Sequence, residues 1–246
     1  MIVGLSYWAV LGLLVTVIGG TLSFLLPAKI GEPLGRKIHH LIFKYFVVYL
    51  RLTGLVYADL EALKTLGKIK TPIIVAPNHS SMWDVVFIIA QLPQAICVMK
   101  KSILRNPFLG GGSRLSGYIP NGSTTRMIRD ASDALLRGGQ LLLFPEGTRT
   151  HPSARWINPL KGGCALISAR SQVPIYPVFF RSDTRYLQKG WPIWKPPDFP
   201  VYLSIGVGKP LLPEDGESAL ELTRRLQVVY EQELARPHPL RRQIDV

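Results

Sequence analysis

The sequence predicts an α/β fold with a mixed, largely parallel sheet flanked by helices, and with a hydrophobic helical membrane anchor at its N-terminus. Two observations lead to this prediction. Short apolar runs, which are typical of buried strands, alternate with segments of helical spacing between residues 58 and 235. Two of these runs lead directly into polar residues, an arrangement typical of the carboxyl edge of a sheet, where α/β proteins bind ligands.

The length and the composition of the chain limit its organisation. A chain of 246 residues has room for one sizeable core and a small appendage. We expect a membrane-anchoring helical segment over residues 1–57, a catalytic domain over residues 58–235 and a loosely ordered tail over residues 236–246. The two cysteines, Cys97 and Cys164, lie in apolar surroundings without metal-ligand spacing, so we expect them to be reduced and buried.

The charge balance indicates a polyanionic partner. The chain has 29 Lys and Arg against 16 Asp and Glu, for a net charge of +13. Such an excess is typical of proteins that bind nucleic acid or an anionic membrane surface. A nucleic-acid-binding protein is expected to cluster its basic residues among aromatic ones. Here the basic residues are dispersed and an apolar segment begins the chain, so we expect membrane lipids and no nucleic acid.

The first 28 residues contain no charged side chain and exceed the roughly 20 residues that a helix needs to cross a bilayer. Gly19, Gly20 and Pro27 interrupt the segment, so a helical hairpin in the membrane plane is the alternative. A cleaved signal peptide would begin with basic residues. Here the basic residues follow the segment, which places the protein at the cytoplasmic face of the inner membrane. They are Lys29, Arg36 and Lys37.

The next segment, residues 41–57, is apolar with a few basic positions. Lys37, Lys44 and Arg51 are seven residues apart and therefore share one face of a helix. We favour a helix that lies in the membrane interface with these cations toward anionic headgroups. The alternative is an amphipathic helix packed on the protein core. Residues 58–70 are more polar and predict a connector or a first strand.

His79 and Asp84 lie between two apolar runs. Residues 73–76 predict a buried strand and residues 85–89 the start of a helix, which places His79 at the exit of a strand. Histidine suits a general base because its unperturbed pKa lies near neutrality. The Asp84 carboxylate can accept a hydrogen bond from one ring nitrogen and leave the other free for a proton. The alternative is an ordinary capping box formed by Ser81 and Asp84.

Downstream, strands and helices continue to alternate. We expect the helix after Asp84 to end near residue 92, and Gly110, Gly111 and Gly112 to form a flexible turn. Two prolines in the run 173–180 predict an edge or bulged strand. The Trp-, Pro- and Lys-rich residues 185–200 predict a loop. The other expected strands cover residues 95–99, 116–120, 140–144 and 201–207, and the other helices cover residues 124–137, 159–170 and 218–234.

A second polar turn, residues 145–149, follows directly on the apolar run 140–144. Gly147 allows the turn to expose main-chain N–H groups, and Arg149 can hold a phosphate with two parallel hydrogen bonds. The alternative is an ordinary polar turn with one glycine. The sequence contains no cluster of metal ligands and no Gly-x-Ser-x-Gly nucleophile motif, so we expect neither a metal nor a covalent intermediate.

Three blocks of sequence together resemble the glycerolipid acyltransferase family, of which the bacterial 1-acylglycerol-3-phosphate acyltransferase is the prototype. They are Asn-His-Ser-Ser-Met-Trp-Asp at residues 78–84, Phe-Pro-Glu-Gly-Thr-Arg at residues 144–149 and Val-Pro-Ile-Tyr-Pro-Val at residues 173–178. They occur in the order typical of the family, and the resemblance covers about residues 71–207. The first two blocks in combination form a specific signature, whereas either alone would be weak.

The resemblance implies transfer of a fatty acyl group from acyl carrier protein or coenzyme A to the hydroxyl of a lysolipid. It implies 1-acyl-sn-glycerol-3-phosphate as the acceptor, phosphatidate as the product and no cofactor besides the acyl thioester. His79 would be the general base and Asp84 the residue that orients it. The substrate-binding residues implied are Glu146, Gly147, Thr148, Arg149 and Lys161.

One block departs from the family pattern. The family has Gly, about two apolar residues and then Asp-Arg, whose Arg holds the acceptor's phosphate. Here residues 117–122 read Gly-Tyr-Ile-Pro-Asn-Gly, without an Arg at the expected place, and Arg114 or Arg126 could substitute from nearby. A lysolipid with another head, such as lyso-ornithine or another amino-acid lipid, therefore stays open as the acceptor, as does lysophospholipid remodelling. A catalytically silent membrane lipid-binding protein is a further alternative.

Overall fold

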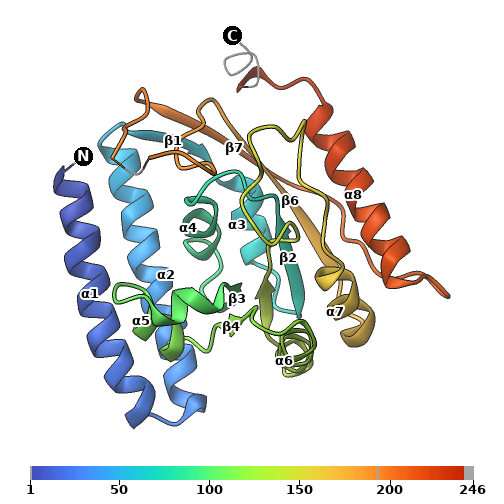
Figure 1. The fold of residues 1–246 in the computed structure, drawn as a ribbon, viewed down its shortest axis with the longest axis horizontal. Helices are drawn as coiled ribbons and strands as arrows, with labels where there is room; N and C mark the ends of the chain where they lie inside the picture. Colours follow the sequence, from blue (N-terminus) through green and yellow to red (C-terminus); the bar gives the residue numbers. More distant parts are fainter. Residues whose placement is uncertain (1, 193, 241–246) are drawn as a thin grey trace.

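The computed structural model describes the backbone of residues 2–192 and 194–240, and side chains from residue 10 onward within those ranges. Two long helices, α1 (Ile2–Leu25) and α2 (Ala28–Leu52), begin the chain. They lie side by side along one flank of an α/β body (Figure 1). We call these two helices the N-terminal hairpin.

The α/β body is built on a seven-stranded sheet in the order β1-β7-β6-β2-β5-β3-β4. Every neighbouring pair of these strands is parallel except β6 and β7, which confirms the predicted mixed, largely parallel sheet. The carboxyl ends of β2 to β6 therefore share one edge of the sheet. The strands are β1 (Val56–Asp59), β2 (Ile73–Pro77), β3 (Ala95–Met99), β4 (Ile119–Pro120), β5 (Gln140–Leu142), β6 (Ile175–Ser182) and β7 (Val201–Val207).

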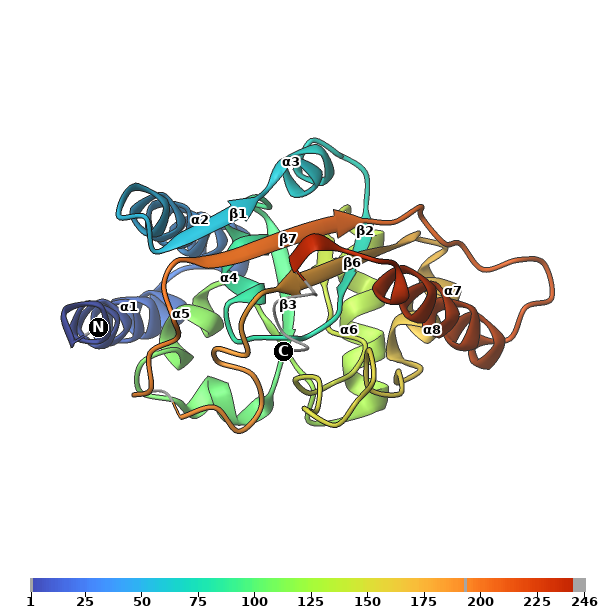
Figure 2. The same ribbon diagram turned by 90° about the horizontal axis from the view of Figure 1, so that it is seen from above.

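Helices cover both faces of the sheet, and two buried clusters separate them from it. One cluster joins the sheet to α2, α3 and α4, and the other joins it to α6, α7 and α8. Seen from above, α7 and α8 lie on the opposite side of the molecule from α1 (Figure 2). The remaining helices are α3 (Glu61–Gly67), α4 (Asp84–Ile89), the 3₁₀ helix η1 (Lys101–Arg105), α5 (Gly110–Leu115), α6 (Thr124–Leu136), α7 (Gly163–Ser171) and α8 (Ala219–Ala235).

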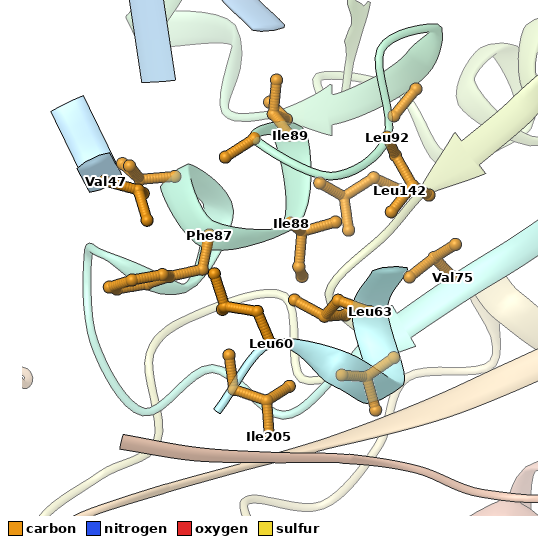
Figure 3. Close-up of a cluster of buried hydrophobic side chains, with 14 of the residues drawn as sticks. Val47, Leu60, Leu63, Val75, Phe87, Ile88, Ile89, Leu92, Leu142 and Ile205 are labelled. Atoms are coloured by element: carbon orange, nitrogen blue, oxygen red, sulfur yellow. The ribbon is translucent and has the colours of Figure 1, made fainter. Parts of the chain in front are cut away.

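The strand that leads to His79 is the most deeply buried part of the sheet. All five residues of β2 are buried, with Val75 in the first cluster and Ile74 and Ala76 in the second. Figure 3 shows Val75 close to Leu63 and Ile88, which come from helices on the first face. Full burial of an aliphatic side chain of this size stabilises the fold by roughly 1.5–3 kcal/mol. The position of His79 is therefore fixed by packing on both faces of its strand.

The N-terminal hairpin covers the segment in which we expected a membrane-spanning helix. No helix in the described part of the chain combines the length and the apolar character needed to cross a bilayer. The α1 helix continues through Gly19 and Gly20 to Leu25, and the chain turns at Pro27. Instead of standing apart, α1 packs on α5 at glycine-to-glycine distance: a β-carbon added to Gly19 would lie 3.0 Å from the Cα of Gly112.

The α2 helix packs on the protein core, which differs from the prediction of a helix in the membrane interface. Phe46, Val47 and Leu50 are buried in the core cluster beside α4, so the alternative of packing on the core is correct for this face. An amphipathic pattern shows that one face is apolar but does not say which apolar medium will cover it. Lys44 and Arg51 lie on the exposed face of the helix, as does Lys37, and exposed apolar side chains lie between them.

One further prediction was wrong, and another was wrong in one of its two alternatives. Residues 110–112 form the buried first turn of α5 rather than a flexible turn. Glycine is needed at these positions because β-carbons there would collide with α1 and with the segment before α5. The β6 strand is interior rather than an edge strand, since it pairs with both β2 and β7. The alternative of a bulged strand fits its register: between the Val178–Val207 pair and the Ile175–Leu211 bridge, residues 176–177 lie opposite residues 208–210. Pro177 is tolerated there because the ladder to β7 only begins at Val178, so no hydrogen bond to β7 needs an N–H from Pro177.

Other expectations are confirmed. The expected strands at residues 95–99 and 201–207 have the predicted bounds, and most other elements differ by a few residues at their ends. Cys97 and Cys164 are buried free thiols. The expected connector at residues 58–70 contains the end of β1 and all of α3. Of the expected tail, residues 241–246 lie outside the described residues.

Candidate active site

Asn78 continues the hydrogen bonding of β2 beyond its last residue. Its main-chain N–H donates to the carbonyl oxygen of Val178 at 3.1 Å. Its side-chain oxygen accepts from the N–H of Phe180 at 2.7 Å, and its side-chain nitrogen donates to the carbonyl oxygen of Phe180 at 3.1 Å. This buried amide takes the place of one more strand residue. It thereby fixes the point at which the chain leaves the sheet toward His79.

The ring of His79 is held from two sides. Nδ1 lies 3.1 Å from Oδ2 of Asp84. The Phe144 ring stacks on the imidazole with a centroid distance of 4.0 Å and an interplanar angle of 27°. A carboxylate at Nδ1 requires the proton on that nitrogen, which leaves Nε2 as the nitrogen that can accept one. The His79 side chain keeps 20% of its surface exposed, so the ring is accessible to a substrate.

The Asp84 carboxylate is buried at the first turn of α4. Oδ2 accepts the main-chain N–H of Ser81 at 2.7 Å, and Oδ1 accepts the hydroxyl of Ser80 at 3.2 Å. Burial raises the pKa of Asp84, and the hydrogen bond from His79 opposes the rise. Of the two hydrogen bonds of a capping box, the one from the Ser81 N–H to the Asp84 carboxylate is present. The Ser81 hydroxyl instead donates to the carbonyl oxygen of Tyr186. Asp84 therefore orients the His79 ring as well as the start of the helix.

Glu146 connects the second polar turn to His79. Oε1 accepts the main-chain N–H of His79 at 2.7 Å, and Oε2 accepts the main-chain N–H of Asn158 at 2.9 Å. The Thr150 hydroxyl donates to both oxygens, at 2.8 and 2.9 Å. Burial raises the pKa of Glu146, and the hydrogen bonds from His79 and Asn158 oppose the rise. The main-chain N–H of Thr150 donates to the His79 carbonyl oxygen at 2.7 Å, so both main-chain groups of His79 are bound to this turn.

Gly147 and Lys161 lie together. Gly147 has φ +67°, a conformation that glycine adopts without strain. A β-carbon at this position would lie 2.8 Å from Nζ of Lys161, so the lysine side chain crosses the space that a larger residue would fill. The main-chain N–H of Lys161 donates to the Pro145 carbonyl oxygen at 2.8 Å. The ammonium group of Lys161 is thus placed directly over the turn.

Arg149 bridges the second turn to the loop between β6 and β7. Its Nη1 donates to the carbonyl oxygens of Leu187 and Gln188 at 2.8 and 3.0 Å. We call residues 183–200 the β6–β7 strap. The Arg149 carbonyl oxygen accepts the side-chain amide of Asn158 at 3.2 Å. Both ends of this arginine are therefore held by neighbouring loops.

The β6–β7 strap is also bound to the segment between His79 and Asp84. The Ser81 hydroxyl donates to the Tyr186 carbonyl oxygen at 3.1 Å, and the Met82 N–H donates to the Leu187 carbonyl oxygen at 3.3 Å. Leu187 has φ +58°, which is uncommon for a residue with a β-carbon. Main-chain carbonyl groups of the strap thus accept hydrogen bonds from the segment between His79 and Asp84 and from Arg149 in the second polar turn.

The block that departs from the family pattern lies at the carboxyl ends of β3 and β4. Asn121 occupies the first position after the β4 strand, and its side-chain oxygen accepts the Lys101 N–H at 3.3 Å. A β-carbon on Gly122 would lie 2.8 Å from Cδ of Lys101. The side chain of Lys101 therefore runs along this block, on the same edge of the sheet as His79.

The two arginines considered as substitutes have different positions. Arg114 donates from Nη1 to the Leu104 carbonyl oxygen at 2.5 Å, and its Nη2 is 3.7 Å from the β-carbon position of Gly20 on α1. The guanidinium therefore lies between α5 and the N-terminal hairpin rather than beside the block. Arg126 is exposed in the first turn of α6. Lys101 is the basic residue that contacts the block itself.

The structure thus brings the predicted residues together through specific contacts. Asp84 and Glu146 each form a hydrogen bond with His79, and Gly147 contacts Lys161. Sequence reasoning missed a set of residues that hold these groups in place. The only signal for them was position, because they directly flank the predicted turns or come from distant segments. They are Asn78, Phe144, Thr150, Asn158 and Leu187.

The geometry can support acid–base chemistry. A buried carboxylate holds one imidazole nitrogen, and the other nitrogen is available to take a proton from a hydroxyl. The adjoining turn carries a cationic side chain at Lys161 and a guanidinium at Arg149. Groups of this kind bind anions and stabilise developing negative charge.

Comparison with known proteins identifies the family of the chain. A model of the Acyltransferase family matches residues 55–181, which is more than half of the chain. A 1-acyl-sn-glycerol-3-phosphate acyltransferase of Pseudomonas aeruginosa is 23% identical over 235 residues, covering 92% of this chain and 88% of that protein. The chloroplastic 1-acyl-sn-glycerol-3-phosphate acyltransferase BAT2 of Brassica napus is 24% identical over 160 residues, covering 63% of this chain. This chain spans about half of that plant protein, 46% of its length.

A solved structure has the same fold. The crystal structure of PlsC, the 1-acyl-sn-glycerophosphate acyltransferase of Thermotoga maritima, aligns with a TM-score of 0.59 at 18% identity. The alignment covers 93% of this chain and 99% of that one. The family match and the two signature blocks lead to one conclusion: this chain belongs to the Acyltransferase family.

Proposed function

We propose that the protein transfers a fatty acyl group from an acyl thioester to the free hydroxyl of 1-acyl-sn-glycerol-3-phosphate, which gives phosphatidate. The observation that carries the proposal is the pair formed by His79 and Asp84 at the sheet edge, 3.1 Å apart and bound to the second turn through Glu146. The names of the similar proteins from Pseudomonas aeruginosa and Brassica napus support this acceptor.

In the proposed reaction, Nε2 of His79 removes the proton of the acceptor hydroxyl as its oxygen attacks the thioester carbonyl carbon. Asp84 keeps Nδ1 protonated and stabilises the imidazolium that forms. The tetrahedral intermediate collapses, the carbon–sulfur bond breaks, and the leaving thiolate takes the proton from His79. The chemistry needs no group beyond the two substrates, with acyl carrier protein or coenzyme A as the carrier.

The acceptor's phosphate is assigned to the cations around the second turn. Lys161 lies over Gly147, next to Thr148 and Arg149. Among the described residues, the hydrogen bonds of the Arg149 guanidinium involve Nη1. A guanidinium has five N–H donors, so Nε and Nη2 keep the fork geometry that fits a phosphate. Lys101 supplies a cation at the block where the family has arginine.

A second class of acceptor follows from that same block. Asn121 stands where the family pattern has acidic and basic residues, and it binds the main chain of Lys101 instead of supplying a guanidinium. A lysolipid with a smaller or less acidic head, such as lyso-ornithine or another amino-acid lipid, or a lysophospholipid for remodelling, fits a site with fewer fixed cations. The headgroup preference therefore distinguishes the two acceptor classes.

We further propose that the protein works on the cytoplasmic face of the inner membrane. The exposed face of α2 carries Lys37, Lys44 and Arg51 among exposed apolar side chains, a combination that favours anionic headgroups. The exposed apolar residues of α1 extend this surface. They include Val10, Leu13, Leu14, Val17 and Ile18.

The experiment is a panel of lysolipids incubated with isotope-labelled acyl-coenzyme A or acyl carrier protein, with the products identified by mass spectrometry. We expect the label in phosphatidate when lysophosphatidate is the acceptor. His79→Ala should lower the rate by about 10²–10⁴-fold, because a positioned general base contributes about that factor. Label in another lipid alone would identify the second acceptor class. Transfer at the wild-type rate by the variant would contradict the base assignment, and no transfer to any acceptor would favour a silent lipid-binding protein.

A further inference from the structure

We propose that Glu146 is a positioning residue that holds the main chain of His79 for proton transfer and makes no contact with the acceptor's polar head. The proposal rests on the proposed function, because it assumes that His79 is the base. It gives Glu146 a role that differs from the substrate-binding role implied by the family resemblance.

The first argument is that the carboxylate is already fully used. Glu146 is 1% exposed, and each of its oxygens accepts one main-chain N–H. The hydroxyl of Thr150 donates to both oxygens. A carboxylate with three donors and almost no accessible surface has little capacity for a hydroxyl of the substrate. Its charge would also repel a phosphate, whereas its neighbours Lys161 and Arg149 would attract one.

The second argument concerns what the carboxylate holds. The bonds run to the N–H of His79, to the loop at Asn158 and to Thr150, whose own N–H binds the His79 carbonyl oxygen. The main chain of His79 is therefore clamped on both sides by the second turn. Its ring is held separately by Asp84 and Phe144. A displacement of about 1 Å in a catalytic group can cost about 100-fold in rate, so a clamp of this kind affects turnover directly.

The chemistry of the clamp makes Glu146→Gln an informative variant. A glutamine has one acceptor oxygen, and its second terminal atom is an NH₂ donor. In either orientation the NH₂ group would face a main-chain N–H, that of His79 or that of Asn158. One of the two bonds is therefore lost while the size and shape of the side chain are kept.

The kinetic experiment compares kcat and acceptor KM for the wild type and Glu146→Gln with saturating acyl donor. We expect kcat to fall about 10- to 100-fold, because the free energy of one hydrogen bond to a charged group corresponds to a factor of about that size. The acceptor KM should stay within about twofold of the wild-type value. Because a positioning role is independent of the headgroup, the same loss is expected for each accepted lysolipid. An acceptor KM raised tenfold or more with unchanged kcat would overturn the proposal.

Thr150 provides a second test that survives a failure of Glu146→Gln to fold. Thr150→Val removes the hydroxyl donor to Glu146 but keeps the main-chain bond to His79. We expect a fall in kcat of about 3- to 10-fold, and Thr150→Ser should restore it because serine keeps the hydroxyl. Thr65→Val is the matched control and should leave kcat unchanged, since the Thr65 hydroxyl donates to the Glu61 carbonyl oxygen on the exposed face of α3. Equal losses in Thr150→Ser and Thr150→Val would contradict the clamp.

Amide hydrogen exchange separates this proposal from the proposed function. In folded Glu146→Gln the exchange of the His79 or the Asn158 N–H should accelerate by at least tenfold relative to the wild type, whatever the substrate proves to be. If the wild type transfers no acyl group but exchange accelerates, the clamp exists and the proposed function is wrong. If transfer is normal in the wild type and neither exchange nor kcat changes in the variant, the clamp is wrong.

Discussion

The buried His39 predicts that the protein loses stability in mild acid. This residue is on α2 at 8% exposure, with Nδ1 2.7 Å from the Ser116 hydroxyl and its ring stacked on Tyr118. A β-carbon added to Gly112 of α5 would lie 3.0 Å from the imidazole. The ring therefore lies at the junction of the N-terminal hairpin with α5. Burial lowers the pKa of His39 from 6.5 to about 4.

The sign and the size follow from proton linkage. Between pH 4 and 6.5 the unfolded chain binds a proton at His39 that the folded chain does not, so the free energy of unfolding falls as the pH falls. The contribution is absent at pH 8, reaches about 2 kcal/mol at pH 5 and levels off near 3 kcal/mol below pH 4. The nearby Arg36 and Glu32 form an ion pair at 3.4 Å.

The measurement is urea unfolding of the wild type and of His39→Gln between pH 8 and pH 4.5. Glutamine keeps a polar side chain near Ser116 but does not titrate. At pH 5 the wild type should lose about 2 kcal/mol more than the variant relative to pH 8, or about 4–8 °C in Tm for a chain of this size. Identical pH dependence in the two proteins would show that His39 does not carry a buried, neutral imidazole and would refute the reasoning.

Two other predictions concern the hairpin and the strap. Gly111→Ala should destabilise the fold by about 1–3 kcal/mol in thermal melts, because its β-carbon would collide with α1. Gly162→Ala should change little, because its β-carbon would only reach van der Waals contact with Oγ1 of Thr223, at 3.8 Å. Similar melts for the two variants would contradict the close packing of α1 on α5. Arg149→Ala removes two hydrogen bonds to the β6–β7 strap, so trypsin should cut after the exposed Lys189 about 10- to 100-fold faster, and acceptor KM should rise. Unchanged cleavage would show that the strap does not depend on Arg149.

The sequence predicted the parts of the site whose chemistry is local. His79 and Asp84 are five residues apart, so the strand and helix around them suffice to predict their meeting. The partners of Glu146 were not predictable in this way, because Asn158 is twelve residues away and His79 comes from another strand. Their contact depends on β2 and β5 being neighbours in the sheet, which no local pattern encodes.

The sequence predicted helices and strands where the hydrophobic periodicity is strong. It did not predict which elements pack against each other. The strands 95–99 and 201–207 have strong local signals and were correct. The buried face of α2 was assigned to lipid because an apolar stripe does not identify its partner, here the core beside α4. The glycines of α5 were interpreted as a flexible turn. Their actual role is to allow close packing on α1, and the α1 residues that they contact lie almost a hundred residues earlier in the chain.

The β6–β7 strap takes part in the site through its backbone oxygens. Tyr186, Leu187 and Gln188 each offer a carbonyl group to Ser81, Met82 or Arg149, and every amino acid has that group. Many substitutions in the strap should therefore leave the path of its main chain and these hydrogen bonds intact. A family model is built on side-chain identities, and the match to this chain ends at residue 181, just before the strap begins. We therefore expect the side chains of this segment to tolerate more variation among related proteins than those of the two polar turns that its carbonyl groups contact.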